Sequence, residues 1–157
     1  MAVGSAEKSG WTLKPSQLLW KLSDRARQAR QVKTLTAEAA LGRRGEDLAH
    51  RYLQQAGYAV IARNYRPGAD SEIDIVARKA EVIVFVEVKS RTSAEYGAPE
   101  RAIDAEKQRH IARAARAYAT RAGIEWSRVR FDVISVVFTK PPSLAHQQDA
   151  FFPGRAN

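Results

Sequence analysis

Residues 81–91, with the sequence EVIVFVEVKSR, restrict the fold of this chain more than any other segment. The unbroken apolar run at residues 82–86 is typical of a strand that is buried on both faces of a sheet. Such a strand needs a packed layer on each side, and helices commonly form those layers. We therefore expect this segment to be the central strand of a sheet with helices packed on it.

The neighbouring segments predict the elements around this strand. Apolar residues recur at helical spacing over 41–56, and Gly57 stands where a glycine ends a helix. Strand patterns occur in three further segments, at residues 58–66, 71–78 and 131–138. A second helix is expected to begin at Pro99 and to end at Gly123. The order α-β-β-β-α-β predicts one α/β domain over residues 37–139, with a mixed sheet flanked by helices.

The two ends of the chain lack this patterning. Residues 1–36 combine many Lys and Arg residues with a few apolar ones, which indicates a basic extension that is flexible or partly helical. As an amphipathic helix it could touch nucleic acid, a partner or an anionic membrane surface. Residues 140–157 include Pro141 and Pro142, and a proline pair cannot continue a strand ladder. An irregular C-terminal tail is therefore expected.

The charge of the chain restricts its partners. Its 26 Lys and Arg residues against 17 Asp and Glu residues give a formal net charge of +9, which favours polyanions and nucleic acid above all. The absence of cysteine excludes disulfides, thiolate zinc sites and cysteine nucleophiles. No stretch has the length and apolarity of a membrane span or a secretory signal, so the sequence favours a cytoplasmic protein.

Two charged residues interrupt the pattern of the central segment. Glu87 and Lys89 share one face because side chains alternate along a strand, and burying such charges without partners costs several kcal/mol each. In the preceding segment, SEIDIV, the same alternation puts Glu72 and Asp74 on one face. A hairpin that turns at residues 79–80 would place Glu72 opposite Glu87, whereas a turn at residues 80–81 would place Asp74 there. Both registers gather carboxylates on a common face, whereas a three-residue loop would reverse the parity and separate them.

Carboxylates gathered in this way favour a divalent cation. Two of them about 5 Å apart repel by about 3 kcal/mol at an effective dielectric of about 20, and a metal ion reverses that sign. Mg²⁺ takes oxygen ligands and keeps several waters, so Asp74 and Glu87 would suffice, with the Val88 carbonyl as a further candidate. Mg²⁺ or Mn²⁺ would activate a water for attack on a phosphodiester. Lys89 would orient that water or stabilise the transition state.

The same residues resemble the PD-(D/E)xK nuclease signature, in which an aspartate precedes an E-x-K motif. Asp74 and Glu87-Val88-Lys89 stand in these places, in the element order of that fold. A longer set of motifs is similar to the YraN family of bacterial proteins, which is described as endonuclease-like and related to archaeal Holliday-junction resolvases. The set comprises GRRGEDLAHRY at 42–52, NYR at 64–66, EIDIV at 72–76, FVEVKSR at 85–91, Tyr96-Gly97 and RFDV at 130–133.

The resemblance implies a role for each matching residue. It makes Asp74 and Glu87 metal ligands, Lys89 the catalytic lysine and Glu46 an additional acid. It also implies that Lys107 contacts nucleic acid. A nuclease of branched DNA would act as a homodimer if two sites are to cut symmetrically.

Four arginines are candidates for nucleic-acid contacts because of their own positions. Arg91 adjoins the predicted site, and Arg109, Arg113 and Arg116 form a stripe along one face of the second helix. The stripe is equally compatible with ordinary solvent exposure.

Plainer interpretations remain open for other residues. Glu87 and Lys89 could be a surface pair, and Glu46 could be a solvated residue at the margin of an apolar stripe. Asp132 is expected to be structural. The three histidines, His50, His110 and His146, lack metal-ligand spacing.

The sequence predicts a Mg²⁺-dependent endonuclease that hydrolyses phosphodiester bonds of DNA rather than RNA, including branched or structured DNA, with water as the nucleophile. The rival hypothesis is a nucleic-acid-binding module with the same fold and charge that does not cut. A third hypothesis is an adaptor that acts through its basic N-terminal segment.

Overall fold

The computed structural model describes residues 37–92 and 103–152. The elements in these ranges are α2 (Ala37–Gln55), β1 (Ala59–Gly68), β2 (Ser71–Lys79), β3 (Val82–Arg91), α3 (Ala105–Ala122), a short 3₁₀ helix (Trp126–Arg128), β4 (Val129–Val137) and β5 (Ser143–Gln147). The predicted order α-β-β-β-α-β is confirmed, and a further strand follows it. Neither described α-helix is long and apolar enough to cross a membrane. The predictions for residues 1–36 and for Tyr96-Gly97 lie outside the described residues.

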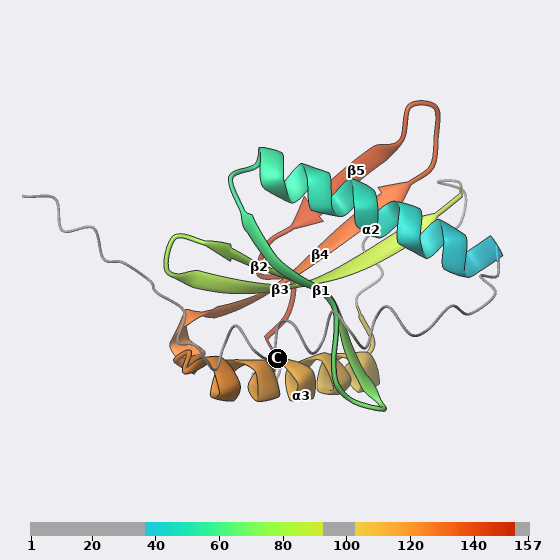
Figure 1. Cartoon of the computed structure of the whole chain (residues 1–157). Coiled ribbons are helices and arrows are strands. Elements are labelled where there is room, and N and C mark those ends of the chain that lie inside the picture. The colour runs from blue at the N-terminus through green and yellow to red at the C-terminus, as the bar shows by residue number, and fades with distance from the viewer. Residues whose placement is uncertain (1–36, 93–102, 153–157) are drawn as a thin grey trace, which may run out of the picture. The chain divides into compact units, whose positions relative to one another are not determined.

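The strands form one mixed sheet in the order β1-β2-β3-β4-β5 (Figure 1). β1, β2 and β3 are joined as antiparallel hairpins, β3 pairs with β4 in parallel, and β4 pairs with β5 antiparallel. The parallel pair needs a crossover, and the segment that contains α3 provides it. β3 is therefore the central strand, as its apolar run predicts.

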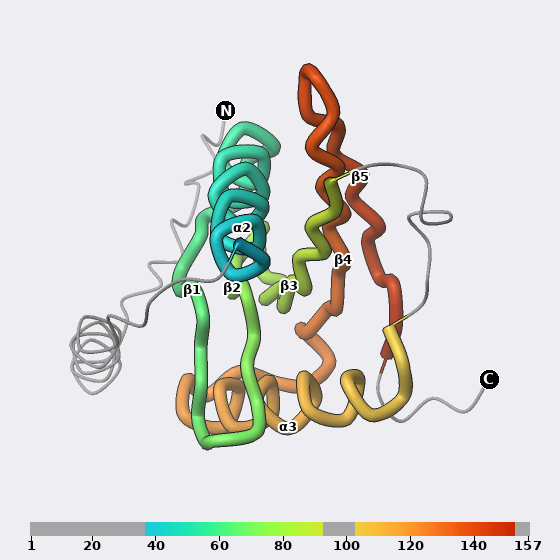
Figure 2. Tube along the Cα trace, turned by 90° about the vertical axis from the view of Figure 1, so that its right-hand side faces the viewer, coloured from blue at the N-terminus to red at the C-terminus, as the bar shows by residue number. Residues whose placement is uncertain are grey.

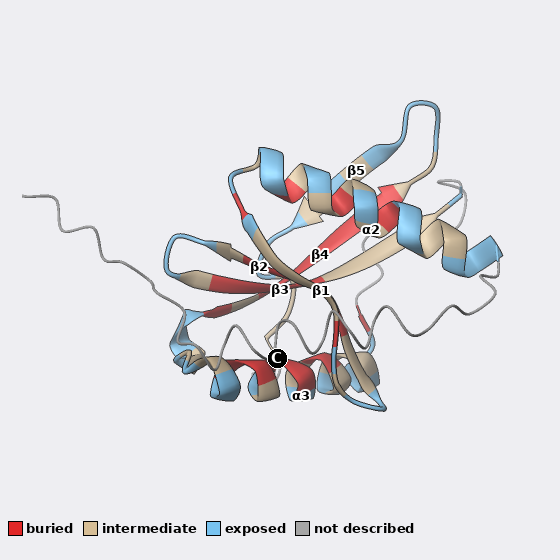
Figure 3. Cartoon of the chain, in the orientation of Figure 1, coloured by how far each residue is buried: buried red, intermediate tan, exposed pale blue. Residues whose placement is uncertain are grey.

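Each helix covers one face of the sheet (Figures 1 and 2). On the α2 face, Ala49 and Leu53 pack into a buried cluster with Ile75, Val84 and Val86. Figure 3 shows the buried residues on the inner side of both helices and along the middle of the strands. Both faces of β3 are thus removed from water, which explains the unbroken apolar run at residues 82–86.

The α3 face is built from aromatic rings. Phe85 lies 5.6 Å from Tyr118 and 5.6 Å from Phe131, measured between ring centroids. Phe151 packs on Phe131 at a centroid distance of 5.2 Å, and Phe152 packs on the same ring at 5.9 Å. The two aromatic residues near the C-terminus are therefore part of this core.

The C-termini of both helices follow the sequence signals, but the start of α3 does not. Gly57 and Gly123 adopt φ angles of 84° and 65°, which glycine reaches without steric cost. α3 begins at Ala105 rather than at Pro99, which lies outside the described residues. Asp104 is its N-cap and accepts a hydrogen bond from the Lys107 N–H at 2.8 Å. An aspartate that satisfies this free amide sets the helix start.

The prediction of an irregular tail over residues 140–157 is wrong for residues 143–147, which form β5, and residues 153–157 lie outside the described residues. β5 pairs with β4 from Val137↔Ser143 to Val133↔Gln147. Pro141 and Pro142 occupy the connection between the two strands, where no ladder hydrogen bond is required of them. The proline pair therefore ends β4 without preventing the chain from returning as an edge strand.

Candidate metal centre

The turn between β2 and β3 decides which carboxylates meet. The ladder runs from Lys79↔Val82 to Ile75↔Val86, so the chain turns at residues 80–81, and Ala80 adopts a φ angle of 52°. This is the second of the two predicted registers. Continued by one residue, it sets Asp74 opposite Glu87.

The two strands separate where the acidic residues stand. Past Ile75, β2 pairs with β1 through Ile73↔Tyr65, whereas β3 continues beside β4 through Glu87↔Val133. The Asp74 side chain bridges the opening, because its Oδ2 accepts a hydrogen bond from the Val88 N–H at 2.7 Å. A carboxylate thus takes the place of a backbone acceptor at the point where the β2–β3 ladder ends.

A cleft of about 740 Å³ lies at this separation. α2 and the two strands line it with the residues Glu38, Leu41, Gly42, Glu46, Asp74, Glu87, Val88, Ser90, Arg91 and Thr92. Three of the four predicted acidic and basic catalytic residues, Asp74, Glu87 and Glu46, therefore line one cavity.

α2 approaches β3 closely beside the cleft. A Cβ atom at Gly45 would overlap Ser90 Oγ, whereas a Cβ at Gly42 would meet no atom within 4 Å. Glycine inside a helix lowers stability relative to alanine by up to about 1 kcal/mol. At Gly45 the close packing of helix on strand accounts for that cost.

The paired acids are held in an environment that disfavours their charge. Burial raises the pKa of Asp74 well above its usual value, and the neighbouring Glu87 raises it further. Burial also raises the pKa of Glu87, although Lys107 opposes the shift. Glu87 Oε2 is buried and, within the described part of the chain, has no hydrogen-bond partner. Two carboxyl groups with raised pKa values hold a proton readily, and a cation that binds them would displace that proton.

Two lysines stand next to Glu87. Lys107 Nζ, from the first turn of α3, lies 3.3 Å from Glu87 Oε1. Lys89 is half-buried two residues further along β3, where burial lowers its pKa and Glu87 acts to raise it. Both lysines predicted from the sequence therefore lie within electrostatic reach of the acid pair.

Glu46 is fixed rather than freely solvated. Asn64 Nδ2 donates to its Oε2 at 3.0 Å, and Arg63 lies 3.4 Å from the same oxygen. Its side chain is 15% exposed and contributes to the raised pKa of Asp74. The structure thus places Glu46 at the site, beside the two predicted metal ligands.

The arginine candidates divide into two groups. Arg91 lines the cleft. Arg109, Arg113 and Arg116 are exposed on α3 and do not line it, and the Arg116 guanidinium lies 4.3 Å above the Trp126 ring. Arg116 therefore has a packing role on the surface of the domain.

The donor set fits an oxygen-bound divalent cation that keeps part of its water. In residues 37–92 and 103–152, no three His, Cys, Asp or Glu side chains converge to form a complete metal-binding group. Mg²⁺ binds through one or two carboxylates and retains waters, so the pair Asp74 and Glu87 meets its requirement. The buried, unpartnered Glu87 Oε2 is the atom of this structure that such an ion would satisfy.

Sequence reasoning missed two residues of the site. Ser90 lines the cleft with a buried hydroxyl, and only the packing of α2 on β3 brings it there. Asn64 holds Glu46 from a φ angle of 49°, a conformation that asparagine adopts more readily than most residues. The NYR motif at residues 64–66 was a signal for Asn64, but no pattern in the sequence pointed to its partner.

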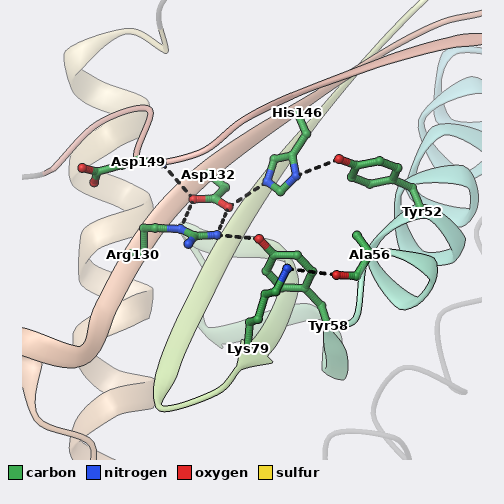
Figure 4. Close-up of polar contacts among 8 residues, drawn as sticks. All are labelled: Tyr52, Ala56, Tyr58, Lys79, Arg130, Asp132, His146 and Asp149. Atoms are coloured by element: carbon green, nitrogen blue, oxygen red, sulfur yellow. Dashed lines mark hydrogen bonds and ion pairs between the residues drawn. The ribbon is translucent and has the colours of Figure 1, made fainter.

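A second polar cluster lies apart from this cleft and is structural (Figure 4). Asp132 is fully buried and accepts hydrogen bonds from the Arg130 guanidinium at 2.7 Å and from the Asp149 N–H at 3.0 Å. His146 Nε2 lies 2.7 Å from Asp132 Oδ2, and its Nδ1 lies 3.3 Å from Tyr52 Oη. The cluster connects α2, β4 and β5, as expected of a structural Asp132.

Comparisons with known proteins agree on one family. The sequence model of the uncharacterised protein family UPF0102 matches residues 45–136. A UPF0102 protein of Solibacter usitatus is 44% identical over 135 residues, which cover 85% of this chain and 98% of that protein. A UPF0102 protein of Geobacter sulfurreducens is 47% identical over 113 residues, covering 71% and 88%. One of Rhodococcus jostii is 43% identical over 114 residues, covering 71% and 96%.

Proposed function

The chain belongs to the UPF0102 family, the YraN family of the sequence resemblance, and we propose that it is a metal-dependent endonuclease of the PD-(D/E)xK type. It hydrolyses phosphodiester bonds of DNA, including branched or structured DNA, with water as the nucleophile. The observation that carries the proposal is the carboxylate pair Asp74–Glu87 at the opening between β2 and β3, in a cleft of about 740 Å³.

The unfavourable burial of the Asp74–Glu87 pair supports a functional role. A surface glutamate is normally solvated, yet the Glu87 side chain is 11% exposed and one of its oxygens has no partner among the described residues. Burying such a group uncompensated is unfavourable by several kcal/mol. A cation would turn this cost into binding free energy, and the protein's net charge of +9 favours a phosphate-bearing ligand beside it.

Each residue of the site has its own role in the proposed reaction. A bound Mg²⁺ or Mn²⁺ supplies a water of lowered pKa and neutralises charge on the phosphodiester. Asp74 and Glu87 hold the ion, and the Val88 N–H fixes the orientation of the Asp74 carboxylate. Lys89 positions the attacking water or donates to the phosphate oxygens as negative charge develops. Glu46 is an additional acid beside the pair, and Arg91, which also lines the cleft, binds a flanking phosphate of the backbone.

One observation favours a second candidate, a nucleic-acid-binding module that does not cut. Lys107 already pairs with Glu87 at 3.3 Å, so part of the acid charge is compensated without metal. In such a module the exposed arginines and Arg91 would bind phosphates, and Asp74 would serve only to cap the Val88 N–H.

A cleavage assay separates the two candidates. The wild type is incubated with linear, single-stranded, flap and four-way DNA in Mg²⁺, in Mn²⁺ and in chelator. We expect metal-dependent cleavage that Lys89→Met lowers by about 10²- to 10³-fold, as the loss of one charge-stabilising donor does in other sites. Arg121→Gln, which removes an exposed charge from the last turn of α3, away from the residues that line the cleft, is the matched control and should cleave as the wild type does. Salt-sensitive DNA binding without cleavage in any metal would contradict the proposal and favour the binding module.

A further inference from the structure

The first turn of α3 anchors a lysine beside the acid pair. Asp104 Oδ1 accepts from the Lys107 N–H at 2.8 Å, and Gln108 Nε2 donates to the Ile103 carbonyl at 2.9 Å. These bonds fix the backbone of Lys107 at the helix N-terminus. Its ammonium, at the end of a flexible four-carbon stem, lies 3.3 Å from Glu87 Oε1.

The two partners of this ion pair differ in their access to water. The Lys107 side chain is 41% exposed, whereas the Glu87 side chain is 11% exposed. The ammonium can therefore leave the pair for solvent by rotation of its own side chain, but the carboxylate cannot. Glu87 meanwhile keeps its second oxygen, Oε2, without a hydrogen-bond partner in the described structure. The lysine thus pairs with one oxygen only, and the Glu87 carboxyl group also lies within hydrogen-bonding reach of the Asp74 side chain.

We propose that Lys107 is a displaceable counter-cation of the metal centre: it neutralises Glu87 in the metal-free protein and is expelled to solvent when a divalent cation binds Asp74 and Glu87. The inference rests on the proposed metal site and adds a residue that sets its affinity. An ammonium and a divalent ion repel each other at the same carboxylate, so each binds at the expense of the other.

Competition of this kind predicts that removing Lys107 has different effects on stability in the metal-free and metal-bound states of the site. Without Lys107, the metal-free protein loses the ammonium group that faces Glu87, and its stability falls. The metal-bound protein loses nothing, because the ammonium has already left. A purely structural ion pair would instead stabilise both states equally, and a purely catalytic lysine would leave metal affinity unchanged.

The test uses the full chain and Mn²⁺ alone, with binding measured by calorimetric titration and stability by thermal melting. For Lys107→Met we expect a Kd for Mn²⁺ at least about fivefold lower than that of the wild type, in the range of ordinary coupling between sites. Its metal-free melting temperature should fall by about 1–3 °C, and its rise with Mn²⁺ should exceed that of the wild type. Lys107→Arg keeps the charge and should bind Mn²⁺ within about twofold of the wild type. Arg121→Gln controls for loss of a positive charge from the same helix.

A second measurement is made on the wild type itself, and a variant serves only to assign the signal. In ¹⁵N-lysine NMR of the wild type, the ammonium signal of Lys107, assigned by its absence from Lys107→Arg, should change to that of a solvated lysine on addition of Mg²⁺. An unchanged signal at saturating Mg²⁺, or equal Mn²⁺ affinity in wild type and Lys107→Met, would overturn the counter-cation while leaving the metal site intact. Absence of Mn²⁺ binding in the wild type and all variants would overturn the proposed function itself.

Discussion

The Asp74 carboxylate has a structural role, and the proposed function gives it a second role as a metal ligand. One oxygen caps the Val88 N–H, and the carboxyl group as a whole lies against Glu87 in a buried position that raises its pKa. A carboxyl group whose pKa is higher in the folded state than in the unfolded chain lowers stability at every pH above the unfolded value. Asp74 therefore lowers the free energy of unfolding of the metal-free protein.

Replacing that charge should separate the two purposes. In Asp74→Asn the amide oxygen still accepts from Val88, while the charge is gone. We expect the metal-free variant to unfold with a free energy equal to that of the wild type or about 1 kcal/mol higher, and to lose the stabilisation by Mg²⁺ or Mn²⁺ that the wild type gains. Melting with and without metal measures both effects. Glu72→Gln, on the same strand but paired with Arg66 at 2.7 Å, is the control and should retain the response to metal. Equal Mn²⁺ affinity in wild type and Asp74→Asn would refute the assigned site.

The glycines of α2 provide a second test at the same scale. Gly45→Ala introduces a methyl group where Ser90 stands, so we expect the free energy of unfolding to fall by about 1–3 kcal/mol, the usual cost of overpacking. Gly42→Ala meets no atom within 4 Å and should raise it by up to about 1 kcal/mol through helix propensity. Urea unfolding of the two variants decides the question. Effects of the same sign would show that α2 does not lie as close to β3 as described.

At the scale of elements, α2, β4 and β5 are joined by the polar cluster around Asp132 (Figure 4). Burial alone would raise the pKa of Asp132, but hydrogen bonds from His146, Arg130 and the Asp149 N–H lower it below the usual value of 3.8. A depressed folded-state pKa contributes stability above the unfolded value, and that stability is lost as the pH falls through the folded value. The edge strand β5 therefore depends on an ionised Asp132.

This dependence predicts a stability difference that varies with pH. Asp132→Asn should lower the free energy of unfolding by about 3 kcal/mol near neutral pH, because it leaves buried partners without their charge. The difference from the wild type should shrink as the pH falls below about 4, because the carboxyl group is protonated there in the unfolded chain, and it should vanish once the folded carboxyl group is protonated at lower pH. Urea unfolding at a series of pH values measures it, and Asp149→Asn, an exposed acid that contacts the cluster only through its backbone, is the matched control. Curves that stay parallel down to about pH 3 would contradict the role of the Asp132 charge.

At the scale of the whole molecule, residues 33–157 form a compact unit of their own, and α2 and α3 cover the two faces of its sheet. A protein that begins at residue 37 should therefore unfold in a single cooperative transition. Its DNA binding should be less salt-dependent than that of the full chain, because phosphate-competent Lys and Arg residues are removed. Thermal unfolding and a salt titration of DNA binding measure the two effects. Loss of the cooperative transition would show that the N-terminal segment contributes to the core.

The sequence by itself determined the element order and the central place of β3. A strand with apolar side chains on both faces must be covered on both faces. Its central position in the sheet therefore follows from the hydrophobicity and period of residues 82–86 alone. The same period placed Glu87 and Lys89 on one face of β3, and Glu72 and Asp74 on one face of β2. These are local properties, and local sequence is sufficient to state them.

Only the tertiary structure decided which of those charges meet and what surrounds them. Two registers of the β2–β3 hairpin were open from sequence, and the turn at residues 80–81 selected the one that pairs Asp74 with Glu87. The packing of α2 brought Glu46 and Ser90 to the cleft, and the capped start of α3 set Lys107 against Glu87. β5 formed beyond the proline pair because β4 offered an edge to pair with. The contacts of Glu46, Ser90 and Lys107 join residues far apart in the chain, and no local sequence pattern gives the distance between two elements that meet only on folding.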